Sequence, residues 1–466
     1  MLIASTIAQA QDIPTLGNSS SNLVSIDQER KLGKAWLRSL RQHTRPYENS
    51  LVEEYFSDLV YSLAPYSNVI DRNFSLIVIN SPDLNAFAVP GSIIGINAGL
   101  FFSAINEQEF ASVIAHELAH LGQRHYARQL EQQRISTPLT LAGVLASVIV
   151  AATTGSDAGM VALASTQALS ADQQLRFSRK NEQEADRIGI KTLFNSRFDP
   201  KAMPTMFERL YKKNRAKGDE QRLEYLSTHP LTESRISDTR NRATQFPVKQ
   251  YRDNIEFHFS KNMVISDFST SKYDAIKHFE AIINKGNSAQ ILAAQFGLAY
   301  ASLKTDPKLS MKILDELLIR FPYKISLKIV YAKALHENKQ SKLAMSTLED
   351  LLSRNPENYS ISDALAELYM QNDLIEESEK LLIKMIRTQP ENPRIWYLLA
   401  EANGLAGHIV DLHQSRAEFF FLSNQFDKAL DQLRLALQKI KTNEQKTASI
   451  HERMNEINEL KENPAF

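Results

Sequence analysis

The stretch VIAHELAHLGQRH, residues 113–125, places two histidines four positions apart with a glutamate between them. The surrounding residues Asn106–Leu130 contain no proline, and their apolar side chains recur at a helical spacing, which predicts a helix. Because positions four apart lie on one face of a helix, His116 and His120 can share one metal ion. Glu117 lies beside that face, where its carboxylate can reach a water molecule without being a ligand. This is the H-E-x-x-H arrangement.

A second helix is predicted for SRKNEQEADRIGIKTL, residues 178–193, in which Glu182 and Asp186 share a face. The chain contains no cysteine, so a third protein ligand must be histidine, glutamate or aspartate. One of the two carboxylates can bind the metal, and the other can accept a hydrogen bond from the second nitrogen of a ligating histidine. Glu184 is expected to point elsewhere. The alternative is a solvated, charged helix face that binds no metal.

The first predicted helix continues to His125. Nine positions separate His125 from His116, which is about two and a half helical turns. His125 is therefore expected to face away from the metal, and we interpret it as a structural residue.

Together, these motifs resemble the zinc endopeptidases of the HtpX and CAAX-prenyl-protease family, in which HELAH is followed by a motif like NEQEAD. NAFAVPGSIIGINAGL, residues 85–100, is similar to the family's strand and turn before the active-site helix, and THPLTESRI, residues 228–236, matches its His-Pro segment. The resemblance covers residues 25–245. The long transmembrane helices of the membrane members are missing, so the chain looks like the soluble periplasmic branch, in which the protease is joined to helical repeats.

The resemblance implies one Zn²⁺ per chain and a role for each site residue. His116, His120 and Glu182 would be the ligands, Asp186 would support the site, and Glu117 would act as the general base. Zinc lowers the pKa of its bound water and polarises the scissile carbonyl, while the general base transfers the proton to the departing amine.

The oxyanion that forms during such a reaction needs a further donor besides the metal, and His229 is the candidate. It precedes Pro230, which stiffens the backbone. Two alternatives remain open: His229 is a surface histidine in a loop, or it is a fourth metal ligand that blocks the resting site. Arg235 could also assist the reaction.

Asn85, Ala86, Phe87 and Ala88, together with the valine that follows, are a candidate exposed edge strand of the protease sheet. An extended peptide could add there as an extra strand and present its backbone to the zinc with little side-chain selection. The alternative is an ordinary internal strand.

The second half of the chain repeats with a period of 34 residues. Four columns of residues keep this step, and they are Pro322, Pro356 and Pro390; Ala332, Ala366 and Ala400; Leu314, Leu348 and Leu382; and Leu318, Leu352 and Ile386. This period of paired helices is typical of tetratricopeptide repeats, which stack into a curved solenoid with a concave binding face. An earlier unit at Tyr273–Leu303 and a later one near Ala417–Ile440 fit more loosely.

The two ends of the chain are expected to lie outside the two domains. MLIASTIAQA, residues 1–10, is a short apolar run ending in an A-x-A pattern, which predicts a signal peptide with a truncated start. A disordered cytosolic N-terminus is the alternative. The lack of cysteine suits an oxidising compartment, and the expected location is the periplasm of a Gram-negative bacterium. Residues 446–466 are expected to form a C-terminal helix or tail.

Two further apolar runs, Leu139–Ala152 and Ala158–Leu169, lie between the two halves of the predicted zinc site. Both are shorter than the roughly 18 residues that span a bilayer, so no transmembrane segment is expected. The runs could form a flap over the cleft that touches a membrane or an unfolded substrate. A buried helical hairpin is an equally good interpretation.

The predicted fold is mainly α. An α+β zincin-type metalloprotease domain with a small sheet is expected in residues 11–245, a linker in residues 246–269, and a solenoid of tetratricopeptide repeats in residues 270–445. The net charge is zero, with 54 basic and 54 acidic residues, which gives no basic field for nucleic acid.

The first functional hypothesis is a periplasmic zinc endopeptidase for quality control. The resemblance implies misfolded or stalled outer-membrane β-barrel proteins as clients and a link, through the repeats, to the barrel-assembly machinery, with a chaperone role in assembly. The second hypothesis is a chaperone or scaffold that acts through the repeats while the protease site stays mostly idle. A zinc hydrolase of another bond, such as a cell-wall amidase, is the third.

Overall fold

The structure is a computed structural model that describes residues 25–132, 179–217, 223–440 and 443–462. The predicted signal peptide and the two apolar runs at 139–152 and 158–169 lie outside the described residues. None of the described helices is long and apolar enough to cross a lipid bilayer.

The N-terminal unit is built around a three-stranded sheet of β1 (Ser75–Ile79), β2 (Ala86–Val89) and β3 (Ile93–Asn97), in the order β1-β3-β2. β1 is parallel to β3, and β2 is antiparallel to it. The turn between β2 and β3 places Gly91 at φ +82°, and a Cβ there would lie 2.8 Å from the carbonyl oxygen of Glu29. Glycine is therefore required at this turn.

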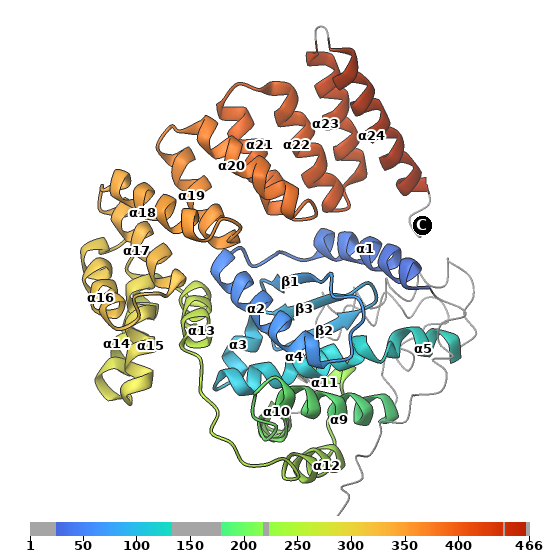
Figure 1. Cartoon of the computed structure of the whole chain (residues 1–466), viewed down its shortest axis with the longest axis vertical. Helices are drawn as coiled ribbons and strands as arrows, with labels where there is room; N and C mark the ends of the chain where they lie inside the picture. Colours follow the sequence, from blue (N-terminus) through green and yellow to red (C-terminus); the bar gives the residue numbers. More distant parts are fainter. Residues whose placement is uncertain (1–24, 133–178, 218–222, 441–442, 463–466) are drawn as a thin grey trace, which may run out of the picture.

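The two faces of the sheet are covered by different helices, because successive strand residues point to opposite sides. α1 (Ile26–His43) packs Trp36 and Leu40 against Ile77 and Val89 on one face. The opposite face, which includes Ile94, packs on α2 (Ser50–Leu63) and α4 (Glu107–Gly122). In Figure 1, α1 and α4 accordingly lie on opposite sides of the strands.

α4 is the central helix of this unit. It begins after Asn106, whose side chain accepts a hydrogen bond from the Glu109 amide, and each of its residues up to His120 is buried. The remaining helical segments of the unit are the 3₁₀ turn η2 (Ala64–Tyr66), α3 (Gly99–Ser103), α5 (His125–Gln132), α9 (Arg179–Asn195), α10 (Ala202–Lys217), α11 (Glu224–Thr228) and α12 (Glu233–Ala243). α9 crosses α4 closely, because a Cβ on Gly189 would lie only 3.4 Å from the Ala115 backbone.

The C-terminal half is a series of helix pairs. These helices are α14 (Lys272–Lys285), α15 (Ser288–Ala301), α16 (Pro307–Arg320), α17 (Ile325–Glu337), α18 (Ser341–Arg354), α19 (Tyr359–Gln371), α20 (Ile375–Thr388), α21 (Pro393–Leu405), α22 (Ile409–Leu422), α23 (Phe426–Lys439) and α24 (Glu444–Glu462). The alanine column and the column that begins at Leu314 are buried. Each of the three repeated prolines follows two residues after the end of a helix. The predicted fold class is confirmed.

The expected linker differs from the structure. Residues 255–268 form helix α13 (Ile255–Phe268), and Phe257 and Phe259 enter the same core cluster as Phe101 and Phe110 of the N-terminal unit. That cluster also contains Leu314 and other residues of the first repeats. The two halves of the molecule therefore share one continuous hydrophobic core through α13.

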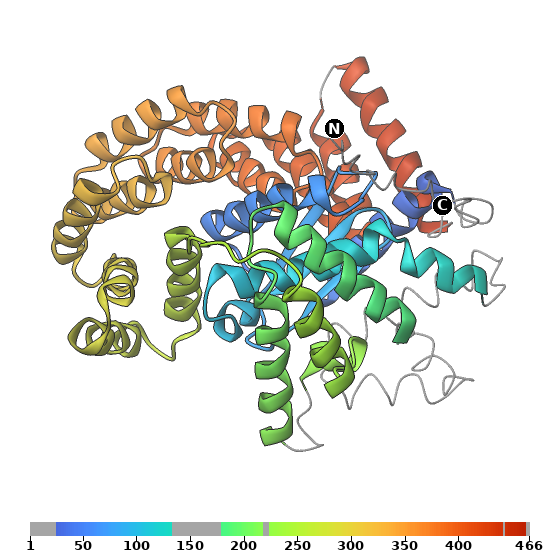
Figure 2. The same cartoon turned by 60° about the horizontal axis from the view of Figure 1, so that its bottom comes forward.

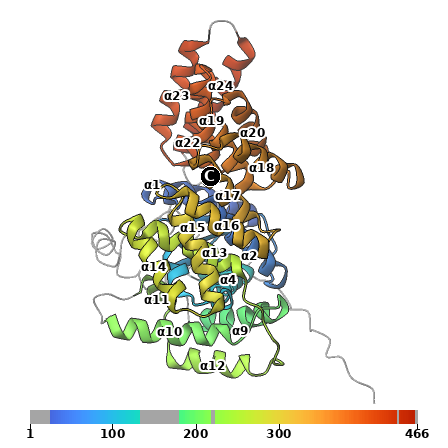
Figure 3. The ribbon, with the colours of Figure 1, turned by 90° about the vertical axis from the view of Figure 1, so that its left-hand side faces the viewer.

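The repeats form an arc around the N-terminal unit (Figures 1 and 2). α19 contacts α2, and α22 contacts α1. At the first contact, the Ser360 hydroxyl donates a hydrogen bond to the carbonyl of Ser50 at 2.8 Å. Seen from the side, the later repeats stand above α1 and α2, while α9, α10 and α12 lie at the opposite end (Figure 3).

Candidate metal centre

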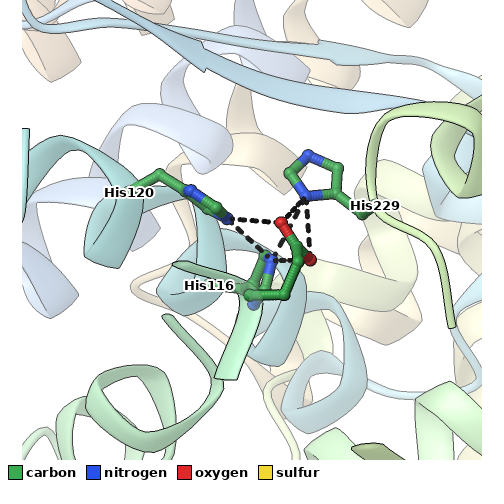
Figure 4. Close-up of side chains that lie close together, drawn as sticks. His116, His120 and His229 are labelled. Carbon is green, nitrogen blue, oxygen red and sulfur yellow. Dashed lines mark hydrogen bonds and ion pairs between the residues drawn. The ribbon is translucent and has the colours of Figure 1, made fainter. Parts of the chain in front are cut away.

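Four side chains from distant parts of the sequence meet in the N-terminal unit. His116 and His120 project from α4, Glu182 projects from α9, and His229 follows α11. One donor atom from each lies within 4.8 Å of the others, and all four residues are buried. Figure 4 shows the three imidazole rings pointing toward one another. The faces of the two predicted helices thus bring together the three ligands that were predicted from the sequence. His229, which lies outside these helices, adds a fourth donor.

The distances between donors match what one zinc ion requires. The Nε2 atoms of His116 and His120 are 3.0 Å apart, and Glu182 oxygens lie 3.5 and 3.4 Å from them. The Nδ1 atom of His229 is 3.2 Å from Glu182 and 3.4 Å from His116. Tetrahedral ligands at about 2.0–2.1 Å from zinc are about 3.3 Å apart, so the nitrogen and oxygen donors present here fit the ion.

Asp186 and Arg235 support the donors from behind. An Asp186 oxygen lies 3.1 Å from Nδ1 of His116, the position expected of a carboxylate that supports a ligating histidine. Arg235 donates two hydrogen bonds to Asp186, at 2.8 and 2.7 Å, and its Nη1 lies 2.7 Å from Glu182. Its guanidinium also donates to the carbonyl of Pro230 at 2.8 Å, directly after His229. Arg235 therefore links Glu182, Asp186 and the backbone that follows His229.

Glu117 lies at the edge of the donor cluster and is completely buried. Its Oε1 atom is 3.5 Å from Nε2 of His229, and neither carboxylate oxygen accepts a hydrogen bond from the residues that the structure describes. Buried carboxylates are normally hydrogen-bonded, so this one is placed to accept a proton donor such as water or a substrate. The position suits the general base expected from the sequence.

The surroundings shift the pKa values of the donors in opposite directions. Burial raises the pKa of Glu182, but the positive charges of His229 and Arg235 outweigh it and hold the pKa well below its usual range. Burial lowers the pKa of His116, but hydrogen bonds to Asp186 and Glu182 raise it overall to about 9. For His120, burial dominates and lowers the pKa. Glu182 is therefore an anion at neutral pH, as a metal ligand must be.

His229 is held between α11 and α12. Its ring lies 4.8 Å from the ring of buried Tyr225, measured between centroids, and its amide donates to the Tyr225 carbonyl. Its Nδ1 atom is in the donor cluster rather than in a surface loop. Of the two alternatives left open by the sequence, this geometry favours the fourth ligand. Tyr225 carries no recognisable motif and was not predicted.

The position of His125 differs from the expectation. The predicted helix ends at Gly122 and a new helix, α5, begins at His125, because Arg124 adopts a left-handed conformation with φ 50°. His125 consequently turns back toward the centre, with its Nδ1 2.9 Å from Nδ1 of His120. Glu184 was expected to point elsewhere, but it lies 3.2 Å from the other nitrogen of His125. Neither contact follows from helical periodicity.

The predicted edge strand, Asn85 to Ala88, largely coincides with β2, which lies at one edge of the described sheet. Phe87 points toward α1, with its ring 5.4 Å from Trp36 between centroids. Ala86 belongs to the core on the α4 side. A cavity beside the strand is lined by Ala88 and His120, among others. The edge therefore lies next to the metal centre.

Comparison with known proteins gives two family matches. The model of Peptidase family M48 matches residues 50–243, which include all four donors, and that of a tetratricopeptide repeat matches residues 335–402. The Beta-barrel assembly-enhancing protease of Escherichia coli (strain K12) is 36% identical over 305 residues, which are 65% of this chain and 62% of the relative.

Similar proteins are also found in two other organisms. A Putative beta-barrel assembly-enhancing protease of Vibrio cholerae is 35% identical over 296 residues, which are 63% of this chain and 60% of the relative. The Mitochondrial metalloendopeptidase OMA1 of Schizosaccharomyces pombe is 29% identical over 231 residues, which are 48% of this chain and 64% of that protein. The matched part of the chain thus spans 60–64% of the length of these relatives.

Proposed function

We propose that the chain is a zinc-dependent endopeptidase with a binding solenoid, because residues 50–243 match the model of Peptidase family M48 and residues 335–402 match that of a tetratricopeptide repeat. The observation that supports this most strongly is the buried carboxylate of Glu117, without a hydrogen-bond donor among the described residues, beside a cluster of four metal-binding side chains.

His116, His120 and Glu182 would hold the zinc ion. The ion would supply Lewis-acid chemistry, since it lowers the pKa of a bound water and polarises a carbonyl. Glu117 accepts the proton of the attacking water and then delivers it to the departing amine. Asp186 orients His116 through its Nδ1 atom, 3.1 Å away, and Arg235 holds both Asp186 and Glu182 in place.

The substrate would bind in an extended conformation along β2. An added strand would pair with β2, at the edge of the described sheet, through backbone hydrogen bonds, which select little for side-chain identity. The small side chain of Ala88 lines the cavity next to His120 and leaves room for the substrate backbone. Such binding suits an enzyme that cleaves unfolded chains of many sequences.

The resting site is closed in this proposal. Catalytic zinc sites keep three protein ligands and one open position, whereas four protein ligands are typical of structural sites. Since Nδ1 of His229 lies among the other three donors, it would fill the fourth position. His229 must leave that position before a substrate can enter, and it would act as a donor to the oxyanion only after this movement.

The clients are a further part of the proposal. The names of the bacterial relatives refer to β-barrel assembly. We extend this to misfolded or stalled outer-membrane β-barrel proteins as substrates, to binding of the barrel-assembly machinery by the repeats, and to the periplasm as the location. The A-x-A pattern at residues 8–10 supports the location.

The decisive experiment replaces the general base. Glu117→Gln should abolish cleavage of unfolded casein, by 1,000-fold or more, while the purified protein keeps one zinc ion per chain. Glu107→Gln is a matched control, because Glu107 is also a buried carboxylate on α4 but accepts hydrogen bonds from Tyr55 and Asn254, away from the donors. Undiminished cleavage by Glu117→Gln would refute the proposal.

His229 would fill the position at the metal that a substrate needs. This also favours the second hypothesis, a chaperone or scaffold whose protease site is mostly idle. Glu117→Gln separates the two functions when it is tested in a strain that lacks the protein. If the variant restores outer-membrane protein assembly although it cleaves nothing, the scaffold role dominates. If it restores nothing while being present at the normal level, proteolysis is the essential activity.

A further inference from the structure

The second ring nitrogen of His120 has an unusual partner. A metal-binding histidine uses one nitrogen for the ion, and its other N–H normally donates to a carboxylate, a backbone carbonyl or water. His116 follows this rule, with Asp186 3.1 Å from its Nδ1. For His120, the neighbour of Nδ1 is another imidazole, that of His125, at 2.9 Å. Both rings are buried.

The direction of the hydrogen bonds follows from the donor cluster. Nε2 of His120 faces His116 and Glu182, so as a ligand it carries no proton, and the hydrogen of the neutral ring is on Nδ1. Nδ1 of His125 must then be the acceptor, which leaves the hydrogen of that ring on Nε2. This nitrogen lies 3.2 Å from Oε2 of Glu184 and can donate to it.

The far end of this chain of contacts is fixed by a second group. Oε2 of Glu184 also accepts a hydrogen bond from Nη1 of Arg128, at 3.2 Å. Glu184 is on α9, the helix that carries Glu182, and Arg128 is on α5. The contacts therefore connect one metal-binding side chain on α4 to both neighbouring helices.

The backbone adopts a strained conformation that makes this possible. A continuous helix would place His125 half a turn from the metal-binding face. Instead, Arg124 has φ 50°, a left-handed conformation that is unfavourable for a non-glycine residue. The guanidinium of Arg124 bonds Glu29 at 3.0 and 2.9 Å, which holds the turn against α1.

We propose that His125 is a positioning residue of the metal centre. It accepts the Nδ1 hydrogen of His120 and so fixes the tautomer and the orientation in which Nε2 faces the ion, and Glu184 in turn orients His125. This proposal rests on the proposed metal site. Loss of such an outer hydrogen bond typically weakens metal binding about 10- to 100-fold.

Two substitutions at His125 separate the hydrogen bond from simple packing. The amide oxygen of asparagine can occupy the position of Nδ1, whereas the longer glutamine places its amide near the position of Nε2. The zinc dissociation constant of the purified full chain is measured by competition with a chelator. We expect His125→Gln to raise it about 10- to 100-fold and His125→Asn to stay within about threefold of the unaltered protein.

Glu184 provides an independent variant. Glu184→Ala should raise the zinc dissociation constant several-fold, because His125 loses the acceptor that orients it. Gln183→Ala is the matched control, since Gln183 is the preceding, exposed residue of the same helix. Thermal unfolding of the metal-free proteins shows whether each variant keeps its fold.

Equal zinc affinity in the unaltered protein, His125→Gln and Glu184→Ala would overturn the proposal. Equal losses in His125→Asn and His125→Gln would also overturn it, because the acceptor at the Nδ1 position would then be irrelevant. Zinc affinity is measured without a substrate, so the outcome is separate from the proposed peptidase activity. A chain that binds zinc as expected but cleaves no protein would refute the activity and leave this inference standing.

Discussion

At the metal centre, three buried carboxylates face a single guanidinium. Glu117, Glu182 and Asp186 surround the donor cluster, and Arg235 is the cation that contacts two of them. Burying several carboxylates together is expensive unless positive charge lies beside them, so this group of acidic side chains suits a site that binds a divalent cation. The acidic side chains and the spacing of the donor atoms thus point to the same kind of ligand.

The first prediction concerns Arg235. Arg235→Gln leaves Glu182 and Asp186 without their guanidinium, so we expect it to lower the free energy of unfolding of the metal-free protein by about 3–5 kcal/mol. Arg240→Gln is the control, because Arg240 is on the same helix and pairs with Glu208 in a mostly exposed position. Its effect should stay below about 1 kcal/mol. Urea unfolding measures both, and equal effects would contradict the assigned role of Arg235.

The second prediction concerns His229. If its Nδ1 closes the fourth position, His229→Ala should raise casein cleavage by the purified full chain several-fold, while weakening zinc binding about 10-fold. Cleavage rates are compared at saturating zinc, with Glu117→Gln as the inactive reference. Loss of cleavage with zinc still bound would instead assign His229 the role of donor to the oxyanion.

At the scale of secondary-structure elements, the periodic features could be predicted and the local exceptions could not. The spacing of Glu182 and Asp186 identified the buried face of α9, and the 34-residue columns identified the repeats. The break after α4 could not be predicted, because the left-handed turn at Arg124 depends on Glu29, which is far away in the sequence. Residues whose contacts come from distant segments leave no periodic signal.

Helix α13 shows a second limit of sequence patterns. Its buried residues spread over more than half of the helix circumference, since it packs against the N-terminal unit and the repeats at once. A helix that is buried all round lacks the apolar stripe that marks an amphipathic helix. The segment consequently resembled a break between domains. For the same reason, no pattern in the sequence indicates that the two halves share a core.

The third prediction tests the close packing at the end of α4. A Cβ on Gly122 would lie 2.4 Å from the carbonyl oxygen of Ser67, so Gly122→Ala must displace backbone. We expect it to lower the free energy of unfolding by about 1–3 kcal/mol. The control is Gly404→Ala on α21, where the nearest atom to the new Cβ is an ordinary 3.7 Å away.

Gly404→Ala should be neutral or stabilise the protein by up to about 1 kcal/mol, because alanine favours a helix over glycine. Thermal unfolding of both variants in the metal-free and zinc-bound states measures the difference. A harmless Gly122→Ala would show that α4 does not need its tight contact with the loop at Ser67.

At the scale of the whole molecule, charged residues join the repeats to the N-terminal unit. Glu54 of α2 accepts hydrogen bonds from Asn358 and from the Ser360 amide at the start of α19. Arg394 of α21 lies 2.8 Å from Asp363 of α19 and 3.5 Å from Glu48, just before α2. With the shared core at α13, these contacts make the two halves one structural unit.

The fourth prediction concerns the pH dependence of this contact. Burial and the negative charge of Asp363 raise the pKa of Glu53 to about 7, although Arg394 and Tyr359 partly oppose them. Because the folded state holds this proton more tightly than the unfolded state, the stabilisation is complete below about pH 4.5 and is lost as the pH rises through 7. Glu53 should thus contribute a fall of about 2–3 kcal/mol in unfolding free energy between pH 5 and 8.

Glu53→Gln should remove this contribution, and the exposed Glu357→Gln should leave it unchanged. Urea unfolding at several pH values gives the slopes for all three proteins. Identical slopes in the unaltered protein and in Glu53→Gln would show that this carboxyl titrates normally and that the contact between α2 and the repeats is insensitive to pH.

The central claim is that three side chains from two separate helices, α4 and α9, hold one zinc ion. Anomalous X-ray diffraction from crystals of the zinc-loaded full chain, recorded on both sides of the zinc absorption edge, tests it most directly. The account predicts one peak per chain, about 2.0–2.2 Å from Nε2 of His116, Nε2 of His120 and a carboxylate oxygen of Glu182. A peak elsewhere, or none at these three side chains, would contradict it.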